Sequence, residues 1–223
     1  MNDPKQRGDF LLVALAILIA WCASISSHAA GIVWTNTAGG NWSLASNWNS
    51  HQVPTSSDTA IITNAGNYTV TLDVSSGVAG LVLGASGTVT TQVFLINGTT
   101  FTLNGQATVN SNGVFNFTSG DLAGTAFITG TLNVQGGALN SGASLTVSNN
   151  GVLNVEGPGT FNIEGPLTNN GTVNWLGGEV QVINSKTATY QGVIWNETGA
   201  EWNVECSGQT LSDSYGNGAE IFN

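Results

Sequence analysis

Residues 151–175 read GVLNVEGPGTFNIEGPLTNNGTVNW and contain the same short phrase three times. The phrase is a glycine, one or two small or apolar residues, and then an asparagine between two apolar residues. Six copies are recognisable, and they begin at Gly113, Gly130, Gly151, Gly159, Gly171 and Gly199. The steps from 113 to 130, 151 and 171 are 17, 21 and 20 residues, and the copy at Gly159 falls between two of the others.

This repeat predicts an all-β fold, a parallel β-helix solenoid. Short alternating strands at a period near 20 residues, without helical spacing of apolar residues, are typical of stacked β-coils. Asn-Gly pairs between the strands, such as Asn112-Gly113, supply the positive φ values that tight corners need. An antiparallel β-sandwich also has short strands, but it does not account for a fixed phrase every 20 residues, so the solenoid is favoured.

The asparagine of each copy is the candidate functional residue. Successive side chains of a strand point to opposite sides, so the flanking apolar residues face the interior and the asparagine faces outward. Stacked coils lie about 4.8 Å apart, and equivalent side chains therefore form ladders along the axis. The sequence predicts one outward asparagine ladder whose amides are candidate binding groups for neutral glycans. Its members are Asn116, Asn133, Asn154, Asn162, Asn174 and Asn203.

The composition limits the classes of partner. The formal net charge is -10, and only Lys5, Arg7 and Lys186 are basic. A protein that binds nucleic acid needs a basic surface, so nucleic acid is excluded as a partner. Hydrophobic residues make up 41% of the chain, which is enough apolar surface for a folded core.

Residues 1–29 have the pattern of a secretory signal peptide. Lys5 and Arg7 precede an apolar stretch at 10–23, and small residues follow up to Ala29, after which cleavage is expected. The apolar stretch has 14 residues, whereas a membrane-spanning helix needs about 20. We therefore expect a secreted or cell-surface protein without a stable membrane span once the signal is removed.

Cys206 is the one cysteine that remains after cleavage, so an intramolecular disulfide is excluded. The alternation of EWNVEC at 201–206 places Cys206 on the same side of the strand as Trp202 and Val204. We expect these three side chains in the core, with Cys206 as an inert thiol.

Residues 30–75 differ from the rest of the mature chain because aromatic mass is concentrated there, at Trp34, Trp42 and Trp48. The end coil of a solenoid exposes apolar positions and open strand edges that a capping element must cover. The sequence therefore predicts an N-terminal Trp-rich cap with the first strands at 30–75, and β-helix repeats at 76–223.

Motifs within the first part are also similar to a known family. They are GGNWS at 39–43, SNW at 46–48, VP at 53–54, SDTAII at 57–62, YTVTLD at 68–73 and GLVLG at 80–84, with LTNNGTVNWLGGEV at 167–180 as a repeat unit. The progression resembles the N-terminal region of secreted bacterial parallel β-helix surface proteins with autotransporter-passenger-like repeats. The resemblance implies export, a right-handed β-helix and a cell-surface or matrix role, usually without assigned chemistry.

The last residues, GNGAEIFN at 216–223, begin another copy of the phrase at Gly218. An uncapped solenoid end is a template for aggregation. We expect that the chain is part of a longer protein or that another chain covers this end, and the first interpretation is favoured.

The residues for catalysis are few. His51 is the one histidine after cleavage, and no cluster with metal-ligand spacing occurs, so neither a cofactor nor a metal is expected. A glycoside hydrolase needs two carboxylates about 5 to 9 Å apart. The candidates are Asp121, Glu156, Glu164, Glu179, Glu201 and Glu205. The favoured interpretation is that these acids keep an otherwise neutral surface soluble.

Three functions remain open. The leading one is a structural or adhesion-type β-helix without catalytic activity, whose partners are glycans, bound weakly, or other surface proteins. The first alternative is a carbohydrate-active enzyme on a β-helix. The second is an ice-binding solenoid, motivated by the outward Thr69 and Thr71 in YTVTL.

Overall fold

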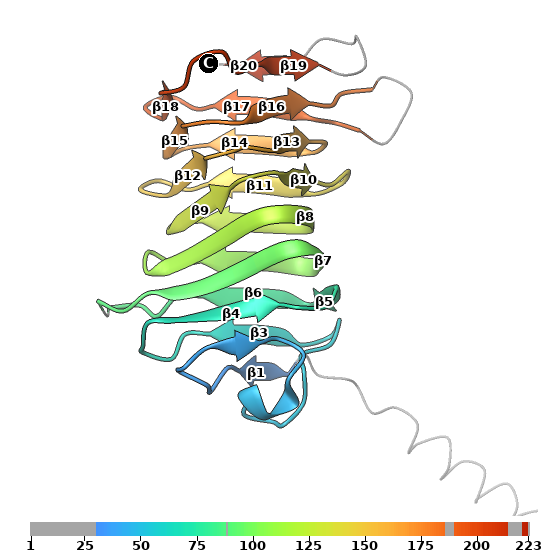
Figure 1. Ribbon diagram of the computed structural model, residues 1–223, viewed down its shortest axis with the longest axis vertical. Helices are drawn as coiled ribbons and strands as arrows, with labels where there is room; N and C mark the ends of the chain where they lie inside the picture. The colour runs from blue at the N-terminus through green and yellow to red at the C-terminus, as the bar shows by residue number, and fades with distance from the viewer. Residues whose placement is uncertain (1–29, 88, 186–189, 214–219, 223) are drawn as a thin grey trace, which may run out of the picture.

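The computed structural model describes residues 30–87, 89–185, 190–213 and 220–222. It confirms the predicted fold class: the chain is nearly all β, and its strands stack in parallel as a β-solenoid (Figure 1). The predicted signal peptide, residues 1–29, and Lys186 lie outside the described residues.

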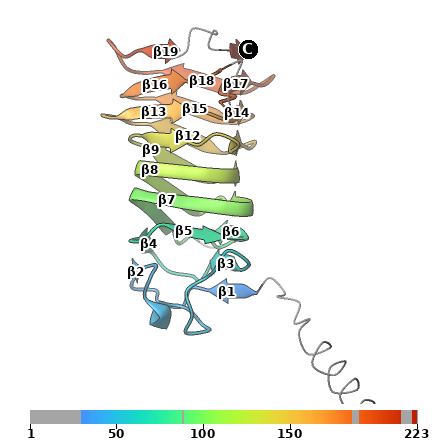
Figure 2. The same cartoon turned by 90° about the vertical axis from the view of Figure 1, so that its right-hand side faces the viewer.

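Each full turn of the solenoid consists of three short strands, and the strands of successive turns form three parallel sheets, here called faces A, B and C (Figure 2). Face A contains β1 (Gly31–Val33), β3 (Thr59–Ile62), β6 (Gly80–Leu83), β11 (Ser144–Val147), β14 (Pro166–Asn169), β17 (Val193–Asn196) and β20 (Glu220–Phe222). Face B contains β2 (Gly40–Asn41), β4 (Tyr68–Leu72), β9 (Thr131–Val134), β12 (Val152–Val155), β15 (Thr172–Trp175) and β18 (Glu201–Val204). Face C contains β5 (Ser76–Val78), β10 (Gly137–Leu139), β13 (Thr160–Ile163), β16 (Glu179–Val182) and β19 (Leu211–Asp213).

Two long strands, β7 (Gln92–Val109) and β8 (Gly113–Ile128), each run around all three faces. Their pairing shifts register at the corners, for example between Thr102 and Gln106. Gly120 and Gly124 in β8 have φ of 102° and 93°, which side chains other than glycine rarely adopt. Glycine at these positions lets one strand turn two corners without leaving the sheet.

The core is the interior of the stack. In the strands from β9 to β16, most second residues are buried and the residues between them are partly exposed. The alternation places each apolar pair of the repeat phrase inside, as with Leu153 and Val155 in β12, which are 0% and 2% exposed. The buried polar side chains of the described residues are hydrogen bonded: Asn47 donates to the Asn41 carbonyl, Gln92 accepts from the N–H of Ala85, and Asn169 donates to Asn196.

The predicted N-terminal cap is present. The segment between β1 and β3 crosses the N-terminal end of the stack (Figure 1) and includes a short 3-10 helix, Ala45–Asn47. Asn49 occupies the outer edge of β1, because its side chain accepts from the N–H of Val33 and its own N–H donates to the Val33 carbonyl. The cap and the repeats at 76–223 nevertheless belong to one continuous sheet system.

Three tryptophans anchor the cap to the core. Trp34, Trp42 and Trp48 are all 0% exposed. Trp48 contacts both Trp34 and Trp42 edge to face, with ring centroids 5.0 and 4.8 Å apart. Trp42 reaches inward to Phe94 at 5.5 Å. Burial of three indole rings gives this end of the solenoid a large apolar contact area.

The C-terminal end differs from the prediction for Cys206 and its neighbours. Trp202 and Cys206 are only partly buried against the core, and Val204 is 61% exposed. Val204 pairs with Trp175 on one side, and no described strand follows β18 on face B. The expectation of a buried trio was therefore wrong for Val204, because a further coil is needed to cover it.

Within the described residues, no helix has the length and apolar character needed to cross a membrane.

Candidate functional site

Five of the six predicted asparagines form one ladder on the outer side of face B. The strand register pairs Asn116 with Asn133, Asn133 with Asn154, Asn154 with Asn174, and Asn174 with Asn203. Each Asn Nδ2 donates to the Oδ1 of the preceding rung, at 2.9, 2.8, 2.9 and 3.0 Å in chain order. These five residues are called the asparagine ladder below.

The sixth asparagine, Asn162, lies elsewhere. It belongs to β13 on face C, where it pairs with Ala138 and Gln181. Its Oδ1 is buried and has no hydrogen-bond partner among the described residues. Its assignment to the ladder was wrong because the copy at Gly159 follows the copy at Gly151 after eight residues, which is less than one turn and leads to the next face.

The amides of the asparagine ladder are partly committed to one another. An inner member such as Asn154 donates one Nδ2 hydrogen to Asn133 and accepts one from Asn174. An asparagine side chain has two donors and two acceptor positions, so about half of its capacity remains for a ligand. The ladder therefore stabilises the sheet, and the predicted binding role of these residues stays a prediction.

The threonines that motivated an ice-binding function point outward, as expected. Thr69 and Thr71 are partly exposed on β4. On the next two turns, Leu95 and then Asn116 occupy the position equivalent to Thr71. The position equivalent to Thr69 on the next turn is Val93. The threonine array is thus not maintained at these two ladder positions.

Most of the candidate catalytic acids lie on separate parts of the surface. Glu156 and Glu205 share one corner, where they follow β12 and β18, two rungs or about 10 Å apart. Glu156 follows β12 and Glu164 follows β13, so they lie at different corners, where Gln135 and the N–H of Ser141 donate to them. Asp121 and Glu179 both lie on face C, but they are three rungs apart through β10 and β13. At about 4.8 Å per rung this is about 14 Å, which exceeds the separation that glycoside hydrolysis requires.

Glu201 and Glu205 lie in and just after β18, and both are exposed. They extend outward from the last coil on face B, where Glu201 pairs with Thr172. Because they are four residues apart on one extended strand, they are about 13 Å apart along the chain. They form no close carboxylate pair of the kind that the enzyme hypothesis needs.

Hydrogen bonds lower the pKa of an aspartate in the N-terminal coils. A hydrogen bond from the Thr55 hydroxyl, at 2.6 Å, and another from the Thr55 N–H, at 2.9 Å, hold the pKa of Asp58 below its ordinary value. This aspartate caps the turn that leads into β3 and lies outside the asparagine ladder. His51 is an exposed loop residue with φ of 52°, and no metal-ligand cluster occurs in the described part of the chain.

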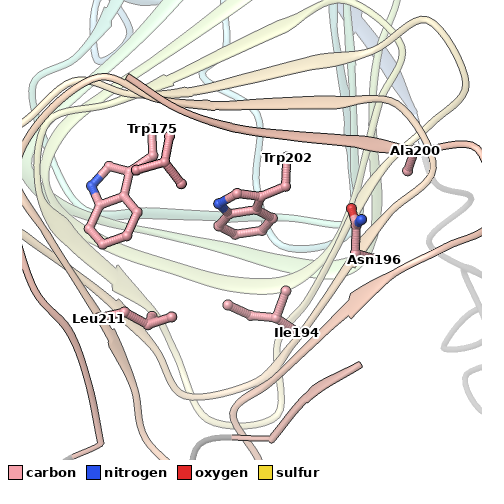
Figure 3. A pocket seen from close by; sticks show the side chains of 7 residues that line it. Trp175, Ile194, Asn196, Ala200, Trp202 and Leu211 are labelled. Carbon is pink, nitrogen blue, oxygen red and sulfur yellow. The ribbon is translucent and has the colours of Figure 1, made fainter. Parts of the chain in front are cut away.

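A pocket opens at the C-terminal end of the core, with a volume of about 510 Å³ (Figure 3). Trp175, Ile194, Trp202 and Leu211 form its apolar walls, and Asn196 is its polar side chain. The lining contains no acid, base or thiol. Among the described residues, the pocket lies at the last turns of the core, and its lining is apolar apart from Asn196.

The sequence analysis missed an outward row on face A, called the A-face stripe. The register links each member to the next, and all are partly or largely exposed. Its members are Ile61, Val82, Thr108, Phe127, Thr146, Thr168, Trp195 and Phe222. A signal existed in the repeated Leu-Thr pair at 145–146 and 167–168, but the remaining rungs are a mixture of Ile, Val, Thr, Phe and Trp.

Charge is unevenly distributed among the faces. From β3 to β17, the outward residues of face A include no acidic or basic side chain, and on face B the same holds from β4 to β15. The described acids lie on face C, at corners and loops, and in the last coil. The solenoid thus presents two uncharged faces although the chain carries a net charge of -10.

Comparison of the chain with models of known families, with curated proteins and with solved structures found no match.

Proposed function

We propose that the protein is an exported, non-catalytic β-solenoid that acts as a rigid spacer and attachment module at a cell surface or in an extracellular matrix. The observation that carries this proposal is the pair of long uncharged faces on an otherwise acidic rod. Solubility favours charged residues spread over the whole surface. A contiguous uncharged face that continues over many turns is therefore more typical of a surface that contacts a partner.

Two further features support the proposal. The asparagine ladder and the interior ladders make the faces straight and continuous, so they provide a repeating surface rather than a single cleft. The candidate carboxylates are dispersed over faces and corners, and the pocket at the C-terminal end has no reactive group. A structural role requires only straight and continuous faces, whereas an enzyme needs several catalytic groups close together in one site.

The test measures attachment and turnover on the same preparation. The protein is purified after export, and its N-terminus is determined by mass spectrometry. We expect cleavage after Ala29, retention on insoluble cell-envelope or matrix material, and no release of reducing sugar from a panel of neutral polysaccharides. Sugar release that Glu179→Gln abolishes would replace this proposal by the enzyme hypothesis, and a protein without retention would not be an attachment module.

A further inference from the structure

We infer that the A-face stripe binds a linear neutral polysaccharide that lies along the solenoid axis. The inference rests on the proposed function and assigns the attachment to one face and to one chemical class of ligand. It moves the glycan contact from the asparagine ladder on face B, where the sequence predicted it, to face A.

The first argument is the chemistry of the stripe. It combines aliphatic side chains, the aromatic rings of Phe127, Trp195 and Phe222, and the hydroxyls of Thr108, Thr146 and Thr168. A neutral sugar chain presents C–H surfaces and hydroxyl groups, which match apolar contacts interrupted by hydroxyl donors and acceptors. The absence of charge among the outward residues of face A from β3 to β17 removes the attraction that an ionic ligand would require.

The second argument is the hydrogen-bonding state of the threonines. The hydroxyls of Thr108, Thr146 and Thr168 make no hydrogen bond to another described residue, whereas each inner amide of the asparagine ladder already spends one donor and one acceptor on its neighbours. Each hydroxyl has one donor and two acceptor positions. The stripe therefore keeps its full polar capacity for a ligand.

The third argument is preorganisation. Stripe members lie on adjacent rungs, so each side chain is held by the one above and the one below. Trp195 and Phe222 are 39% and 43% exposed, and their rings stack with centroids 4.1 Å apart and an angle of 11°. Side chains that are already ordered lose little conformational entropy when a ligand binds.

The dimensions of the stripe favour a chain-like ligand over a second copy of the protein. From Ile61 to Phe222 the stripe passes through seven rung steps, which is about 34 Å at about 4.8 Å per step. With the width of one or two side chains it covers a few hundred Å², whereas a specific protein interface needs roughly 800 Å² from each partner. A peptide recognised by strand addition needs an open sheet edge, and the strands of face A from β3 to β17 are paired on both sides.

The test uses two matched double substitutions in the exported protein. Thr108→Lys with Thr146→Lys places two charges on the stripe, two rungs apart. Thr131→Lys with Thr172→Lys is the control, because these threonines are also outward, partly exposed and two rungs apart, but on face B. Trp195→Ala removes an aromatic ring without adding charge, so it provides a second measurement if a lysine variant fails to fold.

Binding is measured with suspensions of β-1,4-glucan, β-1,3-glucan and chitin, and with polygalacturonate as the acidic comparison. We expect binding to at least one neutral polymer that persists in 0.5 M salt, at least tenfold weaker binding by the stripe double variant, at least threefold weaker binding by Trp195→Ala, and less than a twofold change in the control. Equal loss in both double variants, or loss only in the control, would overturn the assignment to face A.

Two other results separate this inference from the proposed function. Retention on envelope material without binding to any neutral polymer would overturn the inference and leave the proposed function standing. Failure to bind both the envelope material and the neutral polymers would overturn the inference and the proposed function together. A wild-type dimer in sedimentation velocity that Thr108→Lys with Thr146→Lys converts to monomer would identify a second copy as the occupant and overturn the polysaccharide assignment.

Discussion

The clearest quantitative consequence of the structure is the difference between two asparagines that occupy the same position in the repeat phrase. Asn154 is an inner member of the asparagine ladder, with hydrogen bonds of 2.8 and 2.9 Å to its neighbours. Asn162 occupies the equivalent place in its own copy, but its Oδ1 is buried and accepts no hydrogen bond from the described part of the chain. Alanine at both positions therefore makes the same chemical change in two different hydrogen-bonding states.

We expect Asn154→Ala to lower the free energy of unfolding by about 2 kcal/mol, because a hydrogen bond contributes roughly 1 kcal/mol net and two are lost. Water can reach the partly exposed Asn133 and Asn174 amides, so the penalty for leaving them unpaired is small. Asn162→Ala removes an unsatisfied buried oxygen, and we expect a change between about zero and a gain of 1 kcal/mol.

Urea unfolding followed by tryptophan fluorescence and by far-UV circular dichroism measures both variants. For a chain of this size, 2 kcal/mol corresponds to a shift in Tm of roughly 4 to 8 °C. The slope of the free energy of unfolding against urea concentration should not change. The double variant of Asn133 and Asn154 should lose about 1 kcal/mol less than the sum of the single losses, because the two residues share one bond. Equal destabilisation by Asn154→Ala and Asn162→Ala would refute the reasoning, since the ladder bonds would then contribute nothing.

Three other outcomes are expected from the core, from a corner and from pH. Phe94→Ala should lower the free energy of unfolding by about 3 to 5 kcal/mol in the same urea assay, because the ring is 0% exposed. Gly151→Ala should destabilise more than Gly142→Ala in thermal melts, although only Gly142 has positive φ, because a Cβ at 151 would lie 2.0 Å from a backbone oxygen whereas position 142 is open. Since hydrogen bonds from Thr55 lower the folded-state pKa of Asp58, its stabilisation is present above the unfolded-state pKa of about 3.9 and is lost as pH falls through the folded-state pKa. Thr55→Val should therefore lower Tm at pH 7 and have a smaller effect near pH 2.

The sequence predicted face B well because its outward row repeats one residue type. The 17-, 21- and 20-residue steps between the asparagines of the phrase are the register steps of the ladder. The next step is 29 residues, because the turn between β16 and β17 carries extra residues, and the phrase still identifies Asn203. Where the phrase recurs after a full turn, the repeated asparagine therefore identifies the ladder even though the turns differ in length.

The same logic explains what the sequence could not predict. Asn162 carries the phrase on a different face, because each turn has three strands and local alternation does not say which one a segment forms. The A-face stripe escaped notice because its rungs are Ile61, Val82 and Phe127 as well as threonines. These residues share only the lack of charge and their outward direction, and such a row appears only when the register is known.

The last coil shows that the alternation of apolar and polar residues along a strand does not by itself predict burial in a solenoid. Val134, Val155, Trp175 and Val204 occupy one interior ladder position on successive rungs of face B. The first three are 0%, 2% and 6% exposed, and Val204 is 61% exposed. Alternation fixes the direction in which each side chain points, but the neighbouring rung determines whether that side chain is covered. Each coil of this protein is therefore stabilised mainly by the coils on either side of it. The sequence of one strand predicts which side chains point inward, but the neighbouring coils determine whether those side chains are buried.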